Sequence, residues 1–140
     1  MIILDSDVIS ALMARHQLVK LWADGYIPQE FWTTSVVAYE VRRGITLLPS
    51  GKKQRDLDRA FVDILDRVLA GRVLPFDARA AHETALLSVK RTQQGLNVGL
   101  ADTMIAGIAI AHGADVATGN VKDFRDLGAR VINPWDASSG

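Results

Sequence analysis

The sequence predicts a single α/β domain with a mainly parallel sheet, and three observations lead to this prediction. Short apolar or β-branched stretches alternate with helical stretches, which is the order of parallel strands joined by crossover helices. A length of 140 residues fits one domain. No internal repeat and no linker divides the chain. We therefore expect residues 1–140 to form one domain.

The first quarter of the chain predicts two strands separated by two short helices. Ile2–Leu4 is apolar and leads into Asp-Ser-Asp, the pattern of a buried strand followed by a helix start. Helices are expected at about 8–14 and 18–23, with a break at Asp24-Gly25. Phe31–Thr34 is aromatic and β-branched, which favours a second strand.

The middle of the chain predicts two helices and a short strand. Ser35 is expected to cap a helix that runs towards Gly44. Residues 51–70 place apolar side chains at three- and four-residue steps, with charges on the other face, which is typical of an amphipathic helix. Arg72–Leu74 is a strand candidate that ends at Pro75.

The last part of the chain repeats the alternation of helices and strands. Asp77 is expected to cap a helix that continues to about residue 92. Leu100–His112 is apolar nearly all round, which indicates a buried helix, and Gly113 is its C-terminal stop. Val116–Thr118 and Val131-Ile132 complete the predicted sheet.

Composition limits the classes of function. Cysteine is absent, which excludes disulfides and thiolate metal sites. No signal peptide and no apolar stretch of membrane-spanning length is seen, so a cytoplasmic protein is expected. The formal net charge is zero, so any contact with nucleic acid must come from local patches or through bound metal. No glycine-rich phosphate-binding pattern supports a nucleotide cofactor.

Three acids occupy positions where a negative charge is costly. Asp5 follows the first predicted strand, at the sheet edge where ligands bind in open parallel sheets. Glu40 has apolar or small neighbours three and four residues away, and Asp102 lies in the first turn of the apolar helix. The alternatives are helix capping by Asp5 and Asp102, and an ion pair between Glu40 and Arg43.

If these three acids converge, their repulsion destabilises the fold by several kcal/mol unless a divalent cation lies among them. Oxygen ligands favour a hard ion such as Mg²⁺ or Mn²⁺, which would activate water for attack on a phosphodiester.

The sequence resembles the family of PIN-domain ribonucleases. Within that family it is most similar to VapC-type toxins of toxin–antitoxin pairs, in the FitB-like branch. The resemblance extends over nearly the whole chain, because several segments occur in the family's order and spacing. They are IILDSDVIS at 2–10, TSVVAYEVRRGI at 34–45, GRVLPFD at 71–77, GLADTMIAGIAIAHG at 99–113 and VATGNVKDF at 116–124, followed by INPW.

The resemblance implies a three-layer fold with a central parallel sheet of about four or five strands, and cleavage of single-stranded RNA. It also implies that Asp5, Glu40 and Asp102 are the catalytic, metal-binding acids. The fourth acidic position of the family is Asn120 here, and we expect it to be a weaker metal ligand. The family's partners are a cognate antitoxin and a second copy of the chain.

Further polar residues lie beside the predicted site. Ser6 and Thr118 are expected to orient a ligand or water, or simply to cap turns. Asp7 stands where the family usually has Asn, and Asp7 or Asp123 is a candidate to compensate for the charge missing at Asn120. The alternative for Asp123 is a structural cap.

Other polar and aromatic residues are interpreted as parts of the surface or the core. The basic residues are expected to be solvated surface groups, with phosphate contact as the alternative; they are Arg42, Arg43, Lys90 and Arg91. The tryptophans are expected in the core or in a subunit contact; they are Trp22, Trp32 and Trp135.

Two rival functions remain at this stage. Asp5-Ser6-Asp7 also matches the opening of haloacid-dehalogenase-type phosphohydrolases, in which Asp5 would be the nucleophile. That reading leaves Glu40 and Asp102 unexplained. The second rival is a PIN scaffold that binds RNA or a protein without cutting, and the neutral Asn120 gives it some support.

Overall fold

A single parallel sheet forms the centre of the computed structural model, which describes residues 1–136. The strand order β3-β2-β1-β4-β5 places the N-terminal strand in the middle, and all four pairings are parallel. The predicted α/β class is therefore confirmed. The strands are β1 (Ile2–Leu4), β2 (Phe31–Thr34), β3 (Val73–Leu74), β4 (Asp115–Ala117) and β5 (Val131–Ile132).

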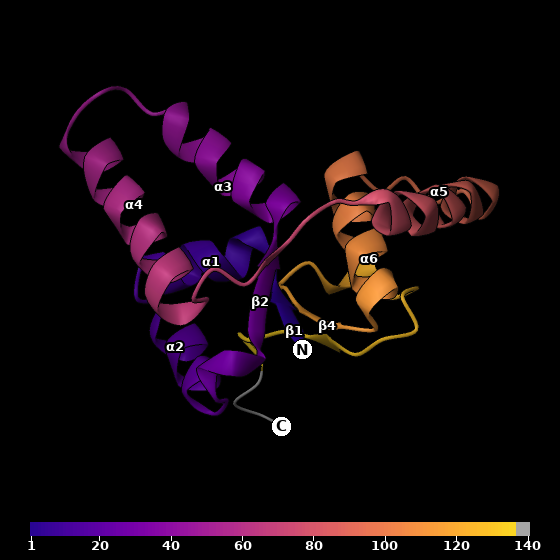
Figure 1. The fold of residues 1–140 in the computed structure, drawn as a ribbon, viewed down its shortest axis with the longest axis horizontal. Helices are drawn as coiled ribbons and strands as arrows, with labels where there is room; N and C mark the ends of the chain where they lie inside the picture. Colours follow the sequence, from indigo (N-terminus) through magenta and orange to yellow (C-terminus); the bar gives the residue numbers. More distant parts are fainter. Residues whose placement is uncertain (137–140) are drawn as a thin grey trace.

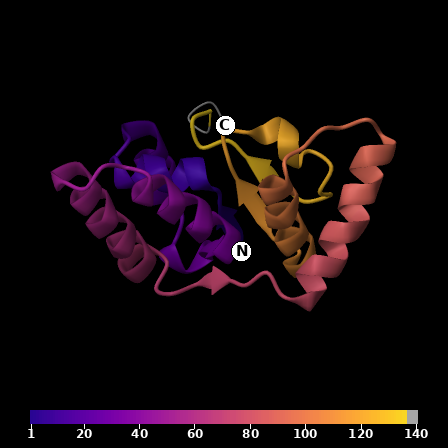
Figure 2. The ribbon, with the colours of Figure 1, turned by 90° about the horizontal axis from the view of Figure 1, so that it is seen from above.

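Helices cover both faces of this sheet. Four lie on one side and two on the other, which gives the three layers expected (Figures 1 and 2). On the first side are α1 (Ser6–Met13), α2 (Gln17–Asp24), α3 (Ser35–Thr46) and α4 (Lys52–Asp63). On the second side are α5 (Ala78–Gln93) and α6 (Leu100–His112). Shorter helical turns are η1 (Pro28–Glu30), η2 (Ile64–Val68) and η3 (Val121–Phe124).

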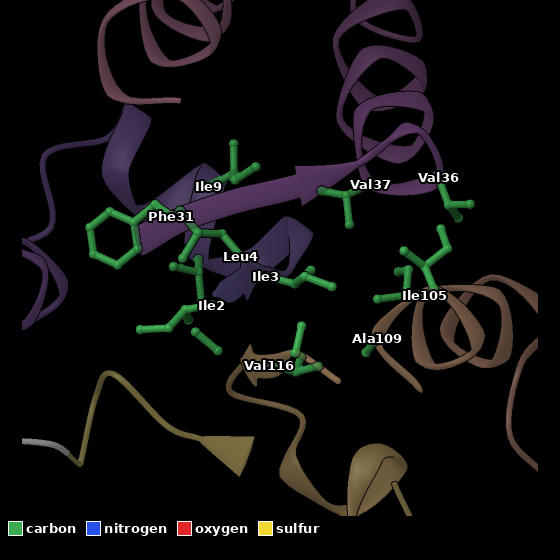
Figure 3. Close-up of a cluster of buried hydrophobic side chains, with 14 of the residues drawn as sticks. Ile2, Ile3, Leu4, Ile9, Phe31, Val36, Val37, Ile105, Ala109 and Val116 are labelled. Carbon is green, nitrogen blue, oxygen red and sulfur yellow. The ribbon is translucent and has the colours of Figure 1, made fainter. Parts of the chain in front are cut away.

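The core lies where these layers meet the central strand. Ile3 and Leu4 of β1 are completely buried, and side chains of α1, α3 and α6 surround them (Figure 3). Burial of one aliphatic side chain contributes about 1.5–3 kcal/mol, so this strand is firmly fixed in place. The residue that follows β1 is therefore held with little freedom.

Two helix boundaries differ from the prediction. Thr34, and not Ser35, caps α3: its backbone is extended and its hydroxyl accepts a hydrogen bond from the Val37 N–H at 3.0 Å. The Ser35 hydroxyl instead accepts from the N–H of Phe76. The segment 51–70, predicted as one helix, forms an α-helix only as far as Asp63. The π-helical turn η2 follows, and there the Leu69 N–H donates to the Ile64 carbonyl.

The parallel arrangement brings the carboxyl ends of β1, β2 and β4 to one edge of the sheet. Asp5 follows β1, helix α3 starts directly after β2, and Thr118 follows β4. This is the edge at which ligands bind in open parallel sheets. In the part of the chain that the structure describes, no helix has the length and apolar character required to cross a membrane.

Candidate active site

Asp5 is held rigidly at the end of the central strand. Its side chain is only 4% exposed. Oδ1 accepts a hydrogen bond from the Ser6 N–H at 2.8 Å, and Oδ2 accepts one from the Thr118 hydroxyl at 2.7 Å. Burial raises the pKa of Asp5 to about 6, although these two hydrogen bonds oppose the shift. Asp5 is therefore the N-cap of α1, and its negative charge is destabilised by burial.

Glu40 lies in the middle of α3 with its carboxylate directed towards Asp5. Its Oε1 is buried and has no hydrogen-bond partner among residues 1–136. The ion pair with Arg43 considered from the sequence does not form in that range. Burial raises the pKa of Glu40, and the negative charges of Asp102 and Asp7 raise it further. An unpaired buried carboxylate oxygen destabilises a protein unless a ligand satisfies it.

Asp102 lies in the first turn of α6, on the other side of the sheet from Glu40. Burial and then the negative charge of Asp5 raise its pKa to about 6, and contact with Asp123 adds to the shift. The Asn120 side-chain amide donates to Asp102 Oδ2 at 3.3 Å. The charge of Asp102 is thus supported by one amide and by the positive end of the α6 dipole.

The structure brings these three acids together from separate parts of the chain. One carboxylate oxygen from each of Asp5, Glu40 and Asp102 lies within 4.8 Å of the other two. Three such oxygens with raised pKa values form a set of hard donors, and the free Glu40 oxygen is one of them. This donor set fits Mg²⁺ or Mn²⁺. The role of the acids as metal ligands and catalytic groups remains a prediction.

Other predicted residues surround this acidic centre, which we define as Asp5, Glu40 and Asp102. Asp7 Oδ2 accepts from the Gly119 N–H at 2.8 Å, and its Oδ1 is buried without a partner among residues 1–136. A Cβ at Gly119 would lie 2.9 Å from Asp7 Oδ2, so any other residue at this position would require the Asp7 carboxylate to shift.

Asn120 connects two acids on the α6 side of the acidic centre. Its amide donates to Asp123 Oδ2 at 2.7 Å as well as to Asp102. Its backbone N–H donates to the Thr118 hydroxyl, which is itself bonded to Asp5. Ser6, Thr118, Asn120 and Asp123 therefore contact the acidic centre or one another, and Asp7 acts on Asp5 and Glu40 through its negative charge.

Comparison with known proteins assigns the family. The PIN-domain model matches residues 2–129. The chain belongs to the PIN-domain family. The match covers most of the sequence, and the PIN fold replaces the haloacid-dehalogenase alternative.

Several curated relatives match nearly the whole chain. VapC ribonuclease Y4jK of Sinorhizobium fredii is 35% identical, over 97% of this chain and 99% of the relative. The plasmid stability protein StbB of Pseudomonas syringae pv. tomato is 37% identical, over 98% and 100% of the two chains. Toxin FitB of Neisseria gonorrhoeae is 32% identical, over 96% and 99%. The resemblance to VapC and FitB toxins seen in the sequence is therefore confirmed.

Solved structures agree with this assignment to the PIN-domain family. A chain of the FitAcB crystal structure from Neisseria gonorrhoeae superposes with a TM-score of 0.86 at 33% identity, covering 96% of this chain and 99% of that one. A chain of DNA-bound VapBC from Salmonella typhimurium gives a TM-score of 0.74 at 22% identity, covering 95% and 97%. The second likeness shows the shared fold.

One expectation about the surface of this PIN domain is wrong. Arg91, interpreted from the sequence as a solvated residue, is 3% exposed and forms an ion pair with Asp126 at 2.7 Å. It lies on the face of α5 that also buries Leu87 and Thr84, four and seven residues earlier. That helical spacing was the available signal, whereas the partner 35 residues away could not be predicted.

A cleft beside the acidic centre is a route by which larger ligands can reach it. The cleft lies between α1, α3 and α4, and Asp7 and Glu40 form its acidic end. The rest of the lining combines Ser6 and Ser10 with apolar side chains, among them Met13, Ile45 and Leu57. A ligand in this cleft would reach the acidic centre of the PIN domain from the Glu40 side.

Proposed function

We propose that this chain is a metal-dependent endoribonuclease that cleaves single-stranded RNA and acts as the toxin of a type II toxin–antitoxin pair, working as one domain of residues 1–140. The observation that carries the proposal is the convergence of Asp5, Glu40 and Asp102, with a buried Glu40 oxygen that lacks a partner among residues 1–136. Relatives named VapC ribonuclease and toxin FitB support it.

In the proposed reaction the three acids hold Mg²⁺ or Mn²⁺. When bound, such an ion lowers the pKa of water and stabilises charge on the scissile phosphate. The chain's own residues keep the donors in place: the Thr118 hydroxyl and the Ser6 N–H fix Asp5, and the Asn120 amide orients Asp102. One carboxylate at this site would take the proton from the attacking water as general base.

The proposed partners follow from the relatives and from the cleft. Solved complexes titled FitAB and VapBC contain chains that superpose on this one, which supports an antitoxin as partner. The acidic end of the cleft at Asp7 and Glu40 suits a basic antitoxin side chain. We further propose that the chain forms a homodimer and acts in the cytoplasm, where its RNA substrate is found.

A PIN scaffold that binds without cutting is the alternative. Asn120 at the fourth acidic position favours it, since an amide contributes no charge to the site. The two functions differ in their response to Mn²⁺, because a scaffold that only binds a partner needs no cation at the acidic centre.

The test is incubation of the purified protein with single-stranded RNA and with total cellular RNA, with Mg²⁺, with Mn²⁺ or with a chelator, followed by mapping of the cut ends. We expect cleavage that a chelator abolishes. We expect the Asp5→Asn and Asp102→Asn variants to fold and to have no cleavage activity. Asp63→Asn is the matched control, because Asp63 is an exposed carboxylate on α4. Persistent cleavage by both site variants would overturn the proposal.

A further inference from the structure

Arg91 is a buried cation close to the acidic centre. Its guanidinium makes two hydrogen bonds to the Asp126 carboxylate, of 2.9 and 2.7 Å. It also donates to the Thr103 hydroxyl at 3.1 Å and to the Asp123 carbonyl oxygen at 2.7 Å. The Arg91 guanidinium therefore joins α5 to two other segments, the start of α6 at Thr103 and the segment of Asp123 and Asp126.

Those two segments each carry an acid of the site. Thr103 is the residue after Asp102 in the first turn of α6. Asp123 is in η3, and its carboxylate accepts from the Asn120 amide that also contacts Asp102. Arg91 thus sets the distance between the start of α6 and the segment that carries Asn120 and Asp123.

The segment around η3 is held by tertiary contacts, such as the completely buried Phe124, more than by its own hydrogen bonds. It is a single turn of four residues, without the repeated hydrogen bonds of a long helix. A planar guanidinium with several donors fixes such a segment in direction as well as in distance, which the single ammonium group of Lys does not achieve.

Stability alone does not explain a buried ion pair at this place. Replacing such a pair by apolar residues of similar volume is often neutral or stabilising, since both charges must be desolvated. What an apolar pair cannot reproduce is the contact with the Asp123 carbonyl and with Thr103.

We propose that Arg91 is a positioning residue of the metal site: it holds Asp123 and Asn120 against Asp102, so that the α6 side of the acidic centre is organised before the cation binds. This inference rests on the proposed function, because it assumes that the acidic centre binds a divalent cation. Arg91 acts through Asp102, Asn120 and Asp123 and does not itself touch the cation.

The test is Mn²⁺ binding, measured from the electron paramagnetic resonance signal of free Mn²⁺, beside thermal unfolding without metal. We expect Arg91→Met to weaken Mn²⁺ binding by about 10- to 100-fold, the usual effect of losing a partner that orients a ligand. The double variant Arg91→Met with Asp126→Leu removes the buried Arg91 charge together with its partly exposed partner. We expect it to regain thermal stability while its Mn²⁺ binding stays weak.

Arg130→Met is the matched control, since it removes an arginine paired with Asp115 at 3.4 Å outside this network. We expect Mn²⁺ binding within about twofold of the wild type. If the methionine variants do not fold, Arg91→Lys keeps the charge and loses the planar fork, and it should still bind Mn²⁺ at least about fivefold more weakly.

The outcomes separate this inference from the proposed function. Wild-type protein that binds no Mn²⁺ contradicts the proposed function and, with it, this role of Arg91. Wild-type protein that binds Mn²⁺ and cuts RNA, together with a folded Arg91 variant that binds Mn²⁺ equally well, overturns the role of Arg91 alone.

Discussion

Two groups of acids in this molecule carry the same charge and behave in opposite ways. On α4 the carboxylates are exposed and have basic partners: Lys52 bonds to Asp56 at 2.8 Å, Arg67 to Asp63 at 2.8 Å, and Arg42 pairs with Asp58. The hydrogen bond from Lys52 lowers the pKa of Asp56. In the acidic centre, burial raises the pKa values of all three acids.

The comparison shows that the environment of an acid, and not its presence, indicates a site. The α4 carboxylates have water and counter-ions, so they need no further ligand. Those of the acidic centre have lost much of their water and repel one another, so the folded chain is more stable when a cation joins them. Substitutions in the two groups of acids test this difference.

Neutralising Glu40 should break the acidic centre while preserving the fold. Glu40→Gln keeps the shape of the side chain and removes one proposed ligand charge. Since metal stabilisation of the transition state is worth several kcal/mol, we expect RNA cleavage to fall about 10²- to 10⁴-fold. Cleavage rates under excess Mg²⁺ measure the effect, and a loss of less than threefold would place Glu40 outside the site.

The raised pKa of Asp5 predicts how stability depends on pH. Between an unfolded value of 3.8 and a folded value of about 6, the native state keeps a proton that the unfolded chain has lost. The contribution of Asp5 alone to the free energy of unfolding should therefore fall by about 3 kcal/mol as pH rises through this window, and remain lower above it.

Asp5→Asn removes this titration. In metal-free denaturant unfolding, the stability of the variant relative to wild type should thus rise by about 3 kcal/mol between pH 4 and pH 7. Saturating Mn²⁺ should stabilise the wild type above pH 6 and leave the variant unaffected. If the difference in stability between the variant and the wild type does not change with pH, the pKa of Asp5 is not raised by folding, and Asp5 resembles the exposed acids of α4 in this respect.

Asp123 and Asp7 differ in how directly they adjoin the acidic centre. Asp123 contacts Asp102 and the Asn120 amide, whereas an oxygen of Asp7 is occupied by the Gly119 N–H. We expect Asp123→Ala to weaken Mn²⁺ binding about tenfold and Asp7→Ala to weaken it less. Calorimetric titration compares them, and unchanged binding in both variants would show that neither compensates for Asn120.

An acid of α4 should show the smallest effect. Asp63→Asn removes an exposed pair with Arg67, so we expect the free energy of unfolding to change by less than about 0.5 kcal/mol. Mn²⁺ binding and RNA cleavage should match the wild type. A clear loss of either would mean that α4 takes part in the reaction, and the contrast between the two groups would disappear.

The sequence predicts the fold well wherever local patterns agree with the tertiary structure. Ile2–Leu4 and Leu100–His112 are strongly apolar and form the central strand and a buried helix with the predicted bounds. The helix after Gly51 stops earlier than its periodicity suggests, since the apolar pattern of an α-helix also fits the π-helical turn that follows Asp63. Helix propensity does not distinguish an α-helix from a π-helical turn.

Each of the three acids could be singled out within its own segment, but it was the family resemblance, and no local pattern, that implied that they meet. Asp5 ends a strand, Glu40 has apolar neighbours and Asp102 opens an apolar helix. Arg91 was misjudged although its spacing from Thr84 and Leu87 places it on the buried face of α5, because its contacts with Asp126 and Asp123 join segments that are distant in sequence. Contacts between distant segments leave no local signal.

The most direct test of the account is Mn²⁺ titration of the wild type beside the triple variant with Asp5→Asn, Glu40→Gln and Asp102→Asn. The wild type should bind Mn²⁺ saturably, with Mg²⁺ as a competitor. The triple variant should fold, unfold at a higher temperature without metal, and bind no Mn²⁺ at this place. Equal binding by both proteins, or none by the wild type, would contradict the claim that these acids meet around a cation.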